Sequence, residues 1–428
     1  MVDTWTWARW HTLIVVAAFV VTALCFVLAP VRVRLANSDD QVRQRLMETG
    51  GVGPHFVEEA RTQGRFYFAT PVYLIPWEIY RLPSGWTFST VRALGFLSGV
   101  ALLGLLCAQQ TGNRALGALV ALVTSAALHL PATFYPVLSY PPMAIGLVAL
   151  LGGLLAQRAH ARNHGFLAGL GSGMGLLIAC LMCEMFVVFL PVFCTVAYGS
   201  GRDGRRRISA ALPALTAATA YLAVYGLFAL RFPSTYDGTH VSLDLAAAAN
   251  ALFRQTFGAV PGFELMALRS PPGTATGAFW RPASQLGELV RAVPGWAWLV
   301  VLVQATATAV LARAALRRSA ASGWTLAVAA ACVLLPNLPI SLTPRYQVFA
   351  HHRMYPYVYS FYAYCAMMAL AVLLWHRLFA PSAQPRSRRA GVAGLLLLSG
   401  AAYASAQTAN HHTFGLLYRW YNDVAAPR

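Results

Sequence analysis

The chain has 428 residues, of which 58% are hydrophobic and only 11% are charged, and its mean hydropathy is +0.55. A soluble protein is typically about 45–50% apolar and about 25% charged. The formal net charge is +18, and all 32 basic residues are arginines, scattered in small groups between apolar runs. A nucleic-acid-binding protein concentrates such charge on one patch. Composition therefore excludes a soluble enzyme, argues against a nucleic-acid partner, and predicts a polytopic membrane protein.

A membrane-crossing helix needs about 20 mostly apolar residues. The first apolar run is long for a signal-peptide core and no small-residue cleavage site follows it, so we expect a retained anchor. We predict an all-α protein of about eleven transmembrane helices that forms a single integral membrane domain over 1–428. The predicted spans lie near 12–30, 90–108, 115–131, 137–156, 166–181, 184–199, 209–230, 295–316, 323–342, 356–379 and 390–408.

The arginines predict the orientation, because short basic loops face the cytoplasm. With Arg9 inside, every alternate loop is basic, provided that 166–199 forms two short spans that turn near Cys183. One tilted helix there would put two basic loops on opposite sides. The loops expected inside contain Arg114, Arg158, Arg162, Arg202, Arg205, Arg206, Arg207, Arg313, Arg317, Arg318, Arg377, Arg386, Arg388 and Arg389.

The acidic residues segregate to the other side. Of the 14 acidic residues, this topology leaves only Asp3 and Asp203 inside. Long loops are where polar residues gather in any membrane protein, but the segregation also fits an extracytoplasmic working surface. We therefore expect a multi-pass inner (plasma) membrane protein with a cytoplasmic N-terminus and three outer loops, 31–89, 231–294 and 343–356.

The outer loops show local structure of their own. In the first loop, Asn37 or Ser38 can cap a helix that continues through Met47. A glycine-rich break over 50–54 precedes a second helical stretch near 55–63. The aromatic run from Pro71 to Tyr80 is interrupted by prolines and fits a re-entrant or interfacial segment. In the second loop, an amphipathic helix is expected over about 242–257.

Three groups of residues are candidates for chemistry. Asp39 and Asp40 follow the first span, and one of them can supply a general base, although an ordinary loop ion pair with Arg32, Arg34 or Arg43 explains them equally simply. Glu184 is an ionisable residue at membrane depth, which marks a functional candidate unless it snorkels to the interface. The third group can bind a phosphate through arginine and imidazolium, or contact lipid headgroups within an aromatic belt; it comprises Arg345, Tyr346, His351, His352 and Arg353.

The seven cysteines provide little chemistry. Cys180 and Cys183 form one CxxC motif with no second pair, so a zinc site is not expected, and a local disulfide stays open. We expect no metal and no cofactor.

Three features occur in a fixed order along the chain: a first span followed by Ser38-Asp39-Asp40, then Gly64-Arg65 before aromatics, and Glu184 after the fifth span. This layout resembles membrane glycosyltransferases of the GT-C fold, and is most similar to bacterial polyprenyl-phosphate-sugar-dependent enzymes of the O-antigen glucosyltransferase type. The resemblance covers the topology of most of the chain, although its motifs are short. No extended soluble C-terminal domain is expected, which argues against the oligosaccharyltransferase branch.

The resemblance implies an inverting sugar transfer at the extracytoplasmic face, from a polyprenyl-phosphate donor to a glycan or lipid-linked acceptor. Asp39, or failing that Asp40, matches the acid that activates the acceptor. Arg345, with His351, His352 and Arg353, falls where the family places cations on the lipid phosphate, while Arg65 and Glu184 match weaker features without an assigned role. Two other classes stay open: a polysaccharide polymerase or ligase that acts on a lipid diphosphate, and a lipid or glycan transporter.

Overall fold

The computed structural model describes residues 4–28, 38–83, 85–129, 141–200, 204–261, 290–318, 321–353, 360–381 and 384–425. For 4–9, 38–41, 200, 204–207, 349–353 and 412–425 it describes the backbone alone. All regular secondary structure in these described ranges is helical. The predicted all-α class is therefore confirmed.

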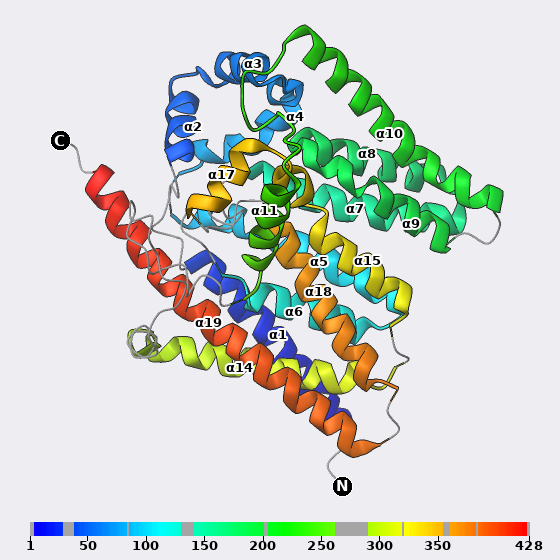
Figure 1. Ribbon diagram of the computed structural model, residues 1–428. Coiled ribbons are helices and arrows are strands. Elements are labelled where there is room, and N and C mark those ends of the chain that lie inside the picture. The colour runs from blue at the N-terminus through cyan, green and yellow to red at the C-terminus, as the bar shows by residue number, and fades with distance from the viewer. Residues whose placement is uncertain are drawn as a thin grey trace.

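Seven helices among the described residues are long and apolar enough to cross a membrane. In Figure 1 most of them run between the lower right and the upper left of the view, while the helix over 295–315 runs nearly across it. This confirms a helical membrane protein. The seven helices are α1 (Thr4–Leu28), α5 (Trp86–Thr111), α7 (Pro141–Asn163), α10 (Gly204–Arg231), α14 (Gly295–Ala315), α18 (Ser360–Phe379) and α19 (Pro385–Ala425).

Four shorter apolar helices coincide with the remaining predicted spans. At 11 to 17 residues, they are shorter than the helix of about 20 residues that a full crossing needs. They are α6 (Arg114–Ala126), α8 (Phe166–Met182), α9 (Leu190–Ser200, after the 3-10 helix η4, Glu184–Phe189) and α15 (Gly323–Leu334).

The segment expected as one span over 323–342 is interrupted. Helix α15 ends at Leu334, and a separate short helix, α16, covers Leu338–Ser341. Pro336 and Pro339 explain the break, because proline lacks the backbone N–H and its ring clashes with the preceding turn.

The chain reverses at Cys183, as the alternation of basic loops predicts. Helix α8 ends at Met182 and η4 begins at Glu184. Ala161 at the end of α7 packs with Ala197 of α9 and Ala210 of α10. The segments 158–162 and 205–210 therefore lie at the same end of the bundle.

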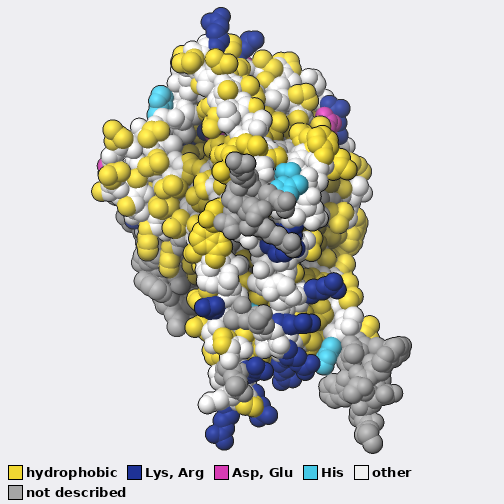
Figure 2. Space-filling view, turned by 90° about the vertical axis from the view of Figure 1, so that its right-hand side faces the viewer, with side chains coloured by type: hydrophobic (Ala, Val, Ile, Leu, Met, Phe, Trp, Pro, Cys, Tyr) yellow, Lys and Arg dark blue, Asp and Glu magenta, His cyan; other side chains and the backbone are white. Residues whose placement is uncertain are grey.

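Hydrogen bonds tie several helix ends together at what we call the basic end, formed by the C-terminal ends of α5, α7, α14 and α18. Asn113 Nδ2 donates to the Ala315 carbonyl oxygen, at 2.9 Å, and His376 Nε2 contacts the same oxygen. Arg158 donates to Gln110 and to the Gln109 carbonyl oxygen. Figure 2 shows basic side chains gathered in the lower part of one face, below a mainly apolar surface.

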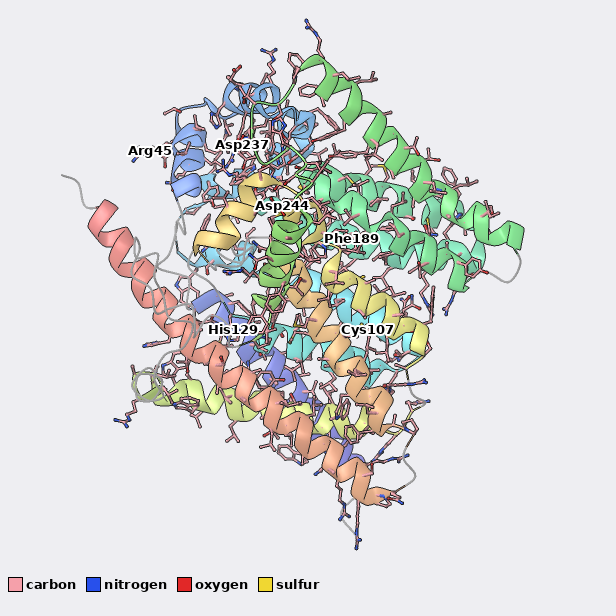
Figure 3. All side chains as sticks on the ribbon, viewed as in Figure 1. Arg45, Cys107, His129, Phe189, Asp237 and Asp244 are labelled. Atoms are coloured by element: carbon pink, nitrogen blue, oxygen red, sulfur yellow. The ribbon has the colours of Figure 1, made fainter. Side chains whose placement is uncertain are left out.

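We call the opposite end the loop end. It contains the acidic side chains that the structure describes, including Asp237 and Asp244 in Figure 3. Its helices outside the bundle are α2 (Ser38–Glu48), α3 (Val52–Gln63), η2 (Phe66–Ala69), α4 (Pro71–Leu74), η3 (Ile75–Arg81), α11 (Leu245–Phe257) and α17 (Pro344–Arg353).

The first loop folds into a compact cap over 38–82. Helices α2 and α3 confirm the two predicted helical stretches and the break between them. The aromatic run forms α4 and η3, and its Tyr73, Trp77 and Tyr80 are buried in an aromatic cluster around Phe56. The guanidinium of Arg43 lies 4.6 Å from the Phe56 ring centre. This cap positions the segment that follows α3.

Helix α11 confirms the helix expected in the second loop. Asp244 caps its N-terminus by accepting a hydrogen bond from the Ala247 backbone N–H at 2.9 Å. Phe253 and Phe257 stack on one another and are exposed on one side of α11, as its amphipathic pattern predicts.

Candidate functional site

The turn after α3 aims Arg65 into the molecule. Gly64 ends α3 with φ of 64°, a left-handed conformation that glycine adopts without a steric penalty. A Cβ at Gly64 would also lie 3.0 Å from the Phe232 carbonyl oxygen of the loop after α10. The glycine before Arg65 therefore has a structural role, because it lets the turn after α3 approach the backbone at Phe232 closely.

Arg65 forms an ion pair with Glu184 across the molecule. Arg65 Nη2 lies 2.9 Å from Glu184 Oε1, and the two side chains are only 11% and 21% exposed. Glu184 is at the point where the apolar helix α8 has ended and the backbone is extended at Cys183. The pair joins the cap to the membrane-embedded bundle.

The second oxygen of Glu184 also accepts hydrogen bonds. The Tyr67 hydroxyl donates to Oε2, and the Cys183 thiol donates to the same oxygen at 3.7 Å. The donors to Oε2 fix the position of the Glu184 carboxylate, and its other oxygen, Oε1, then holds Arg65 in place. The sequence alone could not assign a role to either residue.

The Tyr67 hydroxyl is kept in its donor form by its surroundings. Burial raises the pKa of Tyr67 well above its ordinary value, the charge of Glu184 raises it further, and Arg65 opposes this rise. Tyr67 is therefore a neutral donor to Glu184 at physiological pH, which stabilises the carboxylate in this position.

A second arginine reaches the same place from another part of the chain. The Cζ atom of Arg345, in the first turn of α17, lies 4.6 Å from the centre of the Tyr236 ring. The Cζ atom of Arg65 lies 5.2 Å from that same centre. Cations are attracted to the faces of aromatic rings, so one tyrosine brings two guanidinium groups together.

The structure thus brings together three of the nine predicted site residues: Arg65, Glu184 and Arg345. Tyr346 differs from them, since it is only 4% exposed and packs in the main hydrophobic core. Successive residues of a helix point about 100° apart, so Arg345 and Tyr346 occupy different surroundings.

The other predicted residues are placed by their backbone. Asp39 and Asp40 lie in the first turn of α2, and their side chains lie outside the described residues. His351, His352 and Arg353 form the last turn of α17, and their side chains also lie outside the described residues. Both turns belong to the loop end (Figure 1).

Tyr236 is the residue that sequence reasoning missed. It is one of 18 tyrosines, and nothing in the residues around it distinguishes it from the others. Only the approach of α3 and α17 to the loop after α10 makes its position special.

A small apolar pocket, with room for about one water molecule, lies beside the Glu184 turn. Its six lining residues come from the turn itself and from the neighbouring α15–α16 connection and α18: Cys183, Met185, Phe186, Phe189, Pro336 and Tyr362. Cys180 and Cys183 are both buried and not bonded to each other. Within the described part of the chain, no group of three or more His, Cys, Asp or Glu side chains could hold a metal ion.

Comparison of the chain with protein-family models, with curated proteins and with solved structures finds no match in any of the three. The function must therefore be inferred from the site itself.

Proposed function

We propose that this chain is a GT-C-type membrane glycosyltransferase, which moves a sugar from a polyprenyl-phosphate donor to a hydroxyl of a glycan or lipid-linked acceptor. The main support is the approach of Arg65 and Arg345 to one ring, Tyr236, at the loop end. Arginine forks bind phosphate groups in bidentate fashion. A pair of arginines at the end of a membrane bundle is therefore suited to a lipid phosphate.

The chemistry of this donor needs few protein groups. The acceptor oxygen attacks the anomeric carbon, the bond from that carbon to the phosphate oxygen breaks, and the sugar inverts. The phosphate gains one negative charge as it leaves, so the arginines stabilise the transition state more than the bound donor. No acid is needed to protonate the leaving oxygen, unlike in an ordinary glycosidase.

The acceptor hydroxyl must lose its proton, and we assign this step to Asp39 or Asp40. A positioned general base contributes about 10²–10⁴-fold to a rate. Both residues lie on α2, which belongs to the same cap as the turn that holds Arg65. Glu184 is less suited to this step because its oxygens already accept hydrogen bonds from Tyr67, Cys183 and Arg65.

The orientation is part of the proposal. We place the basic end in the cytoplasm and the loop end outside, because arginine-rich short loops stay inside. The eleven helices then cross or enter the plasma membrane in the alternating order that the sequence predicts. The four short helices contribute inner walls of the bundle.

A polymerase or ligase acting on a lipid diphosphate is the second candidate. The observation in its favour is the pair of guanidinium groups on one ring, since two arginines match two phosphate groups. The nature of the accepted donor separates the two candidates.

The decisive experiment incubates purified protein in nanodiscs with a panel of polyprenyl-phosphate sugars and, in parallel, polyprenyl-diphosphate glycans. The expected result is release of polyprenyl phosphate from one member of the first panel, together with a glycosylated acceptor. Release of diphosphate alone favours the second candidate, and release from neither panel refutes both.

A topology measurement accompanies the assay. Glu48 on α2 and Arg317 at the basic end are each replaced by cysteine, and a membrane-impermeant maleimide is added to intact cells. We expect labelling of Glu48→Cys and no labelling of Arg317→Cys until the cells are opened. The reverse pattern contradicts the proposed location of the site.

A further inference from the structure

The loop over 232–244, which we call the Tyr236 loop, is tied to both segments that hold the arginines. The Thr235 backbone N–H donates to the Thr62 carbonyl oxygen at 3.2 Å, three residues before Arg65. The Ser242 backbone N–H donates to the Leu342 carbonyl oxygen at 2.6 Å, three residues before Arg345. The loop therefore bridges the end of α3 and the start of α17.

Side chains within the loop hold Tyr236 between these two anchors. The Tyr236 backbone N–H donates to Ser234 Oγ at 3.1 Å. Thr239 Oγ1 lies 2.8 Å from the Tyr236 carbonyl oxygen and 2.6 Å from Ser234 Oγ. These contacts hold both the backbone N–H and the carbonyl group of Tyr236 in place.

Gly238 makes room for the ring. It is buried, and a Cβ at this position would overlap the edge of the Tyr236 ring. The ring therefore occupies a place that only glycine leaves open, with the Arg65 and Arg345 guanidinium groups against it.

We infer that Tyr236 and Gly238 are positioning residues, which hold Arg65 and Arg345 as one receptor for the phosphate of a lipid-linked donor. Two like charges repel one another, so bringing them together needs a favourable partner. The Glu184 carboxylate pairs with Arg65, the electron-rich ring attracts both guanidinium groups, and an anion strengthens the arrangement when it binds. This inference rests on the proposed function, because it takes the donor phosphate as the ligand.

The test measures binding of polyprenyl monophosphate to the full-length protein in nanodiscs of neutral lipid. Tyr236→Leu removes the π face and is expected to raise the Kd about tenfold, since each cation–π contact is worth up to about a tenfold change in equilibrium. Tyr236→Phe keeps the ring and is expected to stay within about twofold of wild type.

Gly238→Ala provides an independent displacement of the same ring. Its methyl group pushes on a side chain that can move, so the fold is expected to survive while the Kd rises by a factor similar to that for Tyr236→Leu. The matched control is Gly226→Ala in α10, where an added Cβ meets no atom within 4 Å. The control is expected to bind like wild type.

A double-variant comparison distinguishes positioning from a merely structural role. If Tyr236 acts through Arg345, then Tyr236→Leu adds little to the effect of Arg345→Met, because their effects are coupled. Two effects that multiply independently overturn the inference.

The outcomes separate this inference from the proposed function. Wild-type binding by Tyr236→Leu overturns the inference and leaves the proposed transfer intact. Binding of polyprenyl phosphate without sugar transfer from any donor supports the receptor and refutes the proposed enzyme. A wild-type protein that does not bind polyprenyl phosphate overturns the inference.

Discussion

Arginines at the two ends of the molecule have different partners. At the basic end, Arg158 donates to the Gln109 carbonyl oxygen at 2.6 Å, and Arg377 donates to the Ala321 carbonyl oxygen at 2.9 Å. At the loop end, Arg65 pairs with the Glu184 carboxylate, and both Arg65 and Arg345 lie against an aromatic ring. At the basic end these arginines donate to backbone carbonyl groups, whereas at the loop end they contact a carboxylate or an aromatic ring.

The difference matches a structural role for arginine at the basic end and the proposed role in phosphate binding at the loop end. The Gln109 carbonyl belongs to the last turn of α5, where it has no intrahelical partner and a cation interacts favourably with the helix dipole, whereas Ala321 lies in the connection before α15. A ring attracts a guanidinium through its face, and Arg65 at the same time pairs through Nη2 with Glu184 and donates through Nη1 to Gln63. We expect substitution of Arg158 at the basic end to change stability, and substitution of Arg345 at the loop end to change binding.

The largest expected effect concerns the acids of α2, one of which is the proposed general base. We predict that Asp39→Asn and Asp40→Asn differ, and that one of them lowers sugar transfer by about 10²–10⁴-fold, the usual contribution of a general base. The measurement is the rate of polyprenyl phosphate release, with membrane insertion checked in parallel.

Asp244→Asn is the matched control for this experiment. Asp244 is an exposed acid at the same end, and asparagine caps a helix about as well as aspartate. Its transfer rate is expected to equal that of wild type. If both α2 variants also keep the wild-type rate, the base has been assigned to the wrong residues.

The next effect is on stability, at the ion pair that joins the cap to the bundle. Glu184→Gln leaves the Arg65 charge without its carboxylate in a mostly buried place, and we expect it to lower the free energy of unfolding by about 2–3 kcal/mol. Glu78→Gln breaks a pair with Arg81 whose side chains are 50% and 58% exposed, and its effect is expected within about 0.5 kcal/mol.

Denaturant-induced unfolding in detergent measures both variants. Equal losses for Glu184→Gln and Glu78→Gln would show that burial of the first pair is unimportant. A large loss for the exposed pair alone would contradict the ranking directly.

The sequence predicted the class of the fold better than the geometry of the site. Apolar runs and alternate basic loops were sufficient for the all-helical class and for the reversal at Cys183, because both depend on local composition. Of the eleven expected spans, seven coincide with described helices that are long enough to cross a membrane. The short α15 was not foreseen, since the effect of Pro336 and Pro339 was outweighed by the apolar residues around them. The Arg65–Glu184 pair joins segments far apart in the chain, and such contacts depend on how the helices pack, which no local pattern records.

The third prediction compares the replacement of one arginine by methionine at each end. Arg158→Met at the basic end removes a donor to two neighbouring groups of α5, and we expect a loss of about 1–2 kcal/mol in stability with unchanged binding of polyprenyl phosphate. Arg345→Met at the loop end is expected to weaken binding about tenfold or more, with little change in unfolding, because the side chain is exposed. Binding isotherms and unfolding curves on the same preparations check both. A binding defect in Arg158→Met with a normal unfolding curve would remove the distinction between the two ends.

The smallest expected effect is a change in the pH dependence of stability at Tyr67. Burial, and then the Glu184 charge, raise the pKa of Tyr67 above its ordinary value of 10.0. The unfolded chain therefore loses this proton near pH 10 while the folded protein keeps it, so the stabilisation is complete below pH 10 and declines as the pH rises toward the folded pKa. Between pH 10 and 11 the decline amounts to about 1 kcal/mol for one such proton.

Tyr67→Phe is expected to remove this part of the slope, whereas Tyr198→Phe, at an exposed position of α9, is expected to leave it unchanged. Unfolding free energies at pH 8, 9, 10 and 11 measure the slope. Identical slopes for Tyr67→Phe and wild type would mean that the Tyr67 hydroxyl is not the neutral donor that holds Glu184 against Arg65.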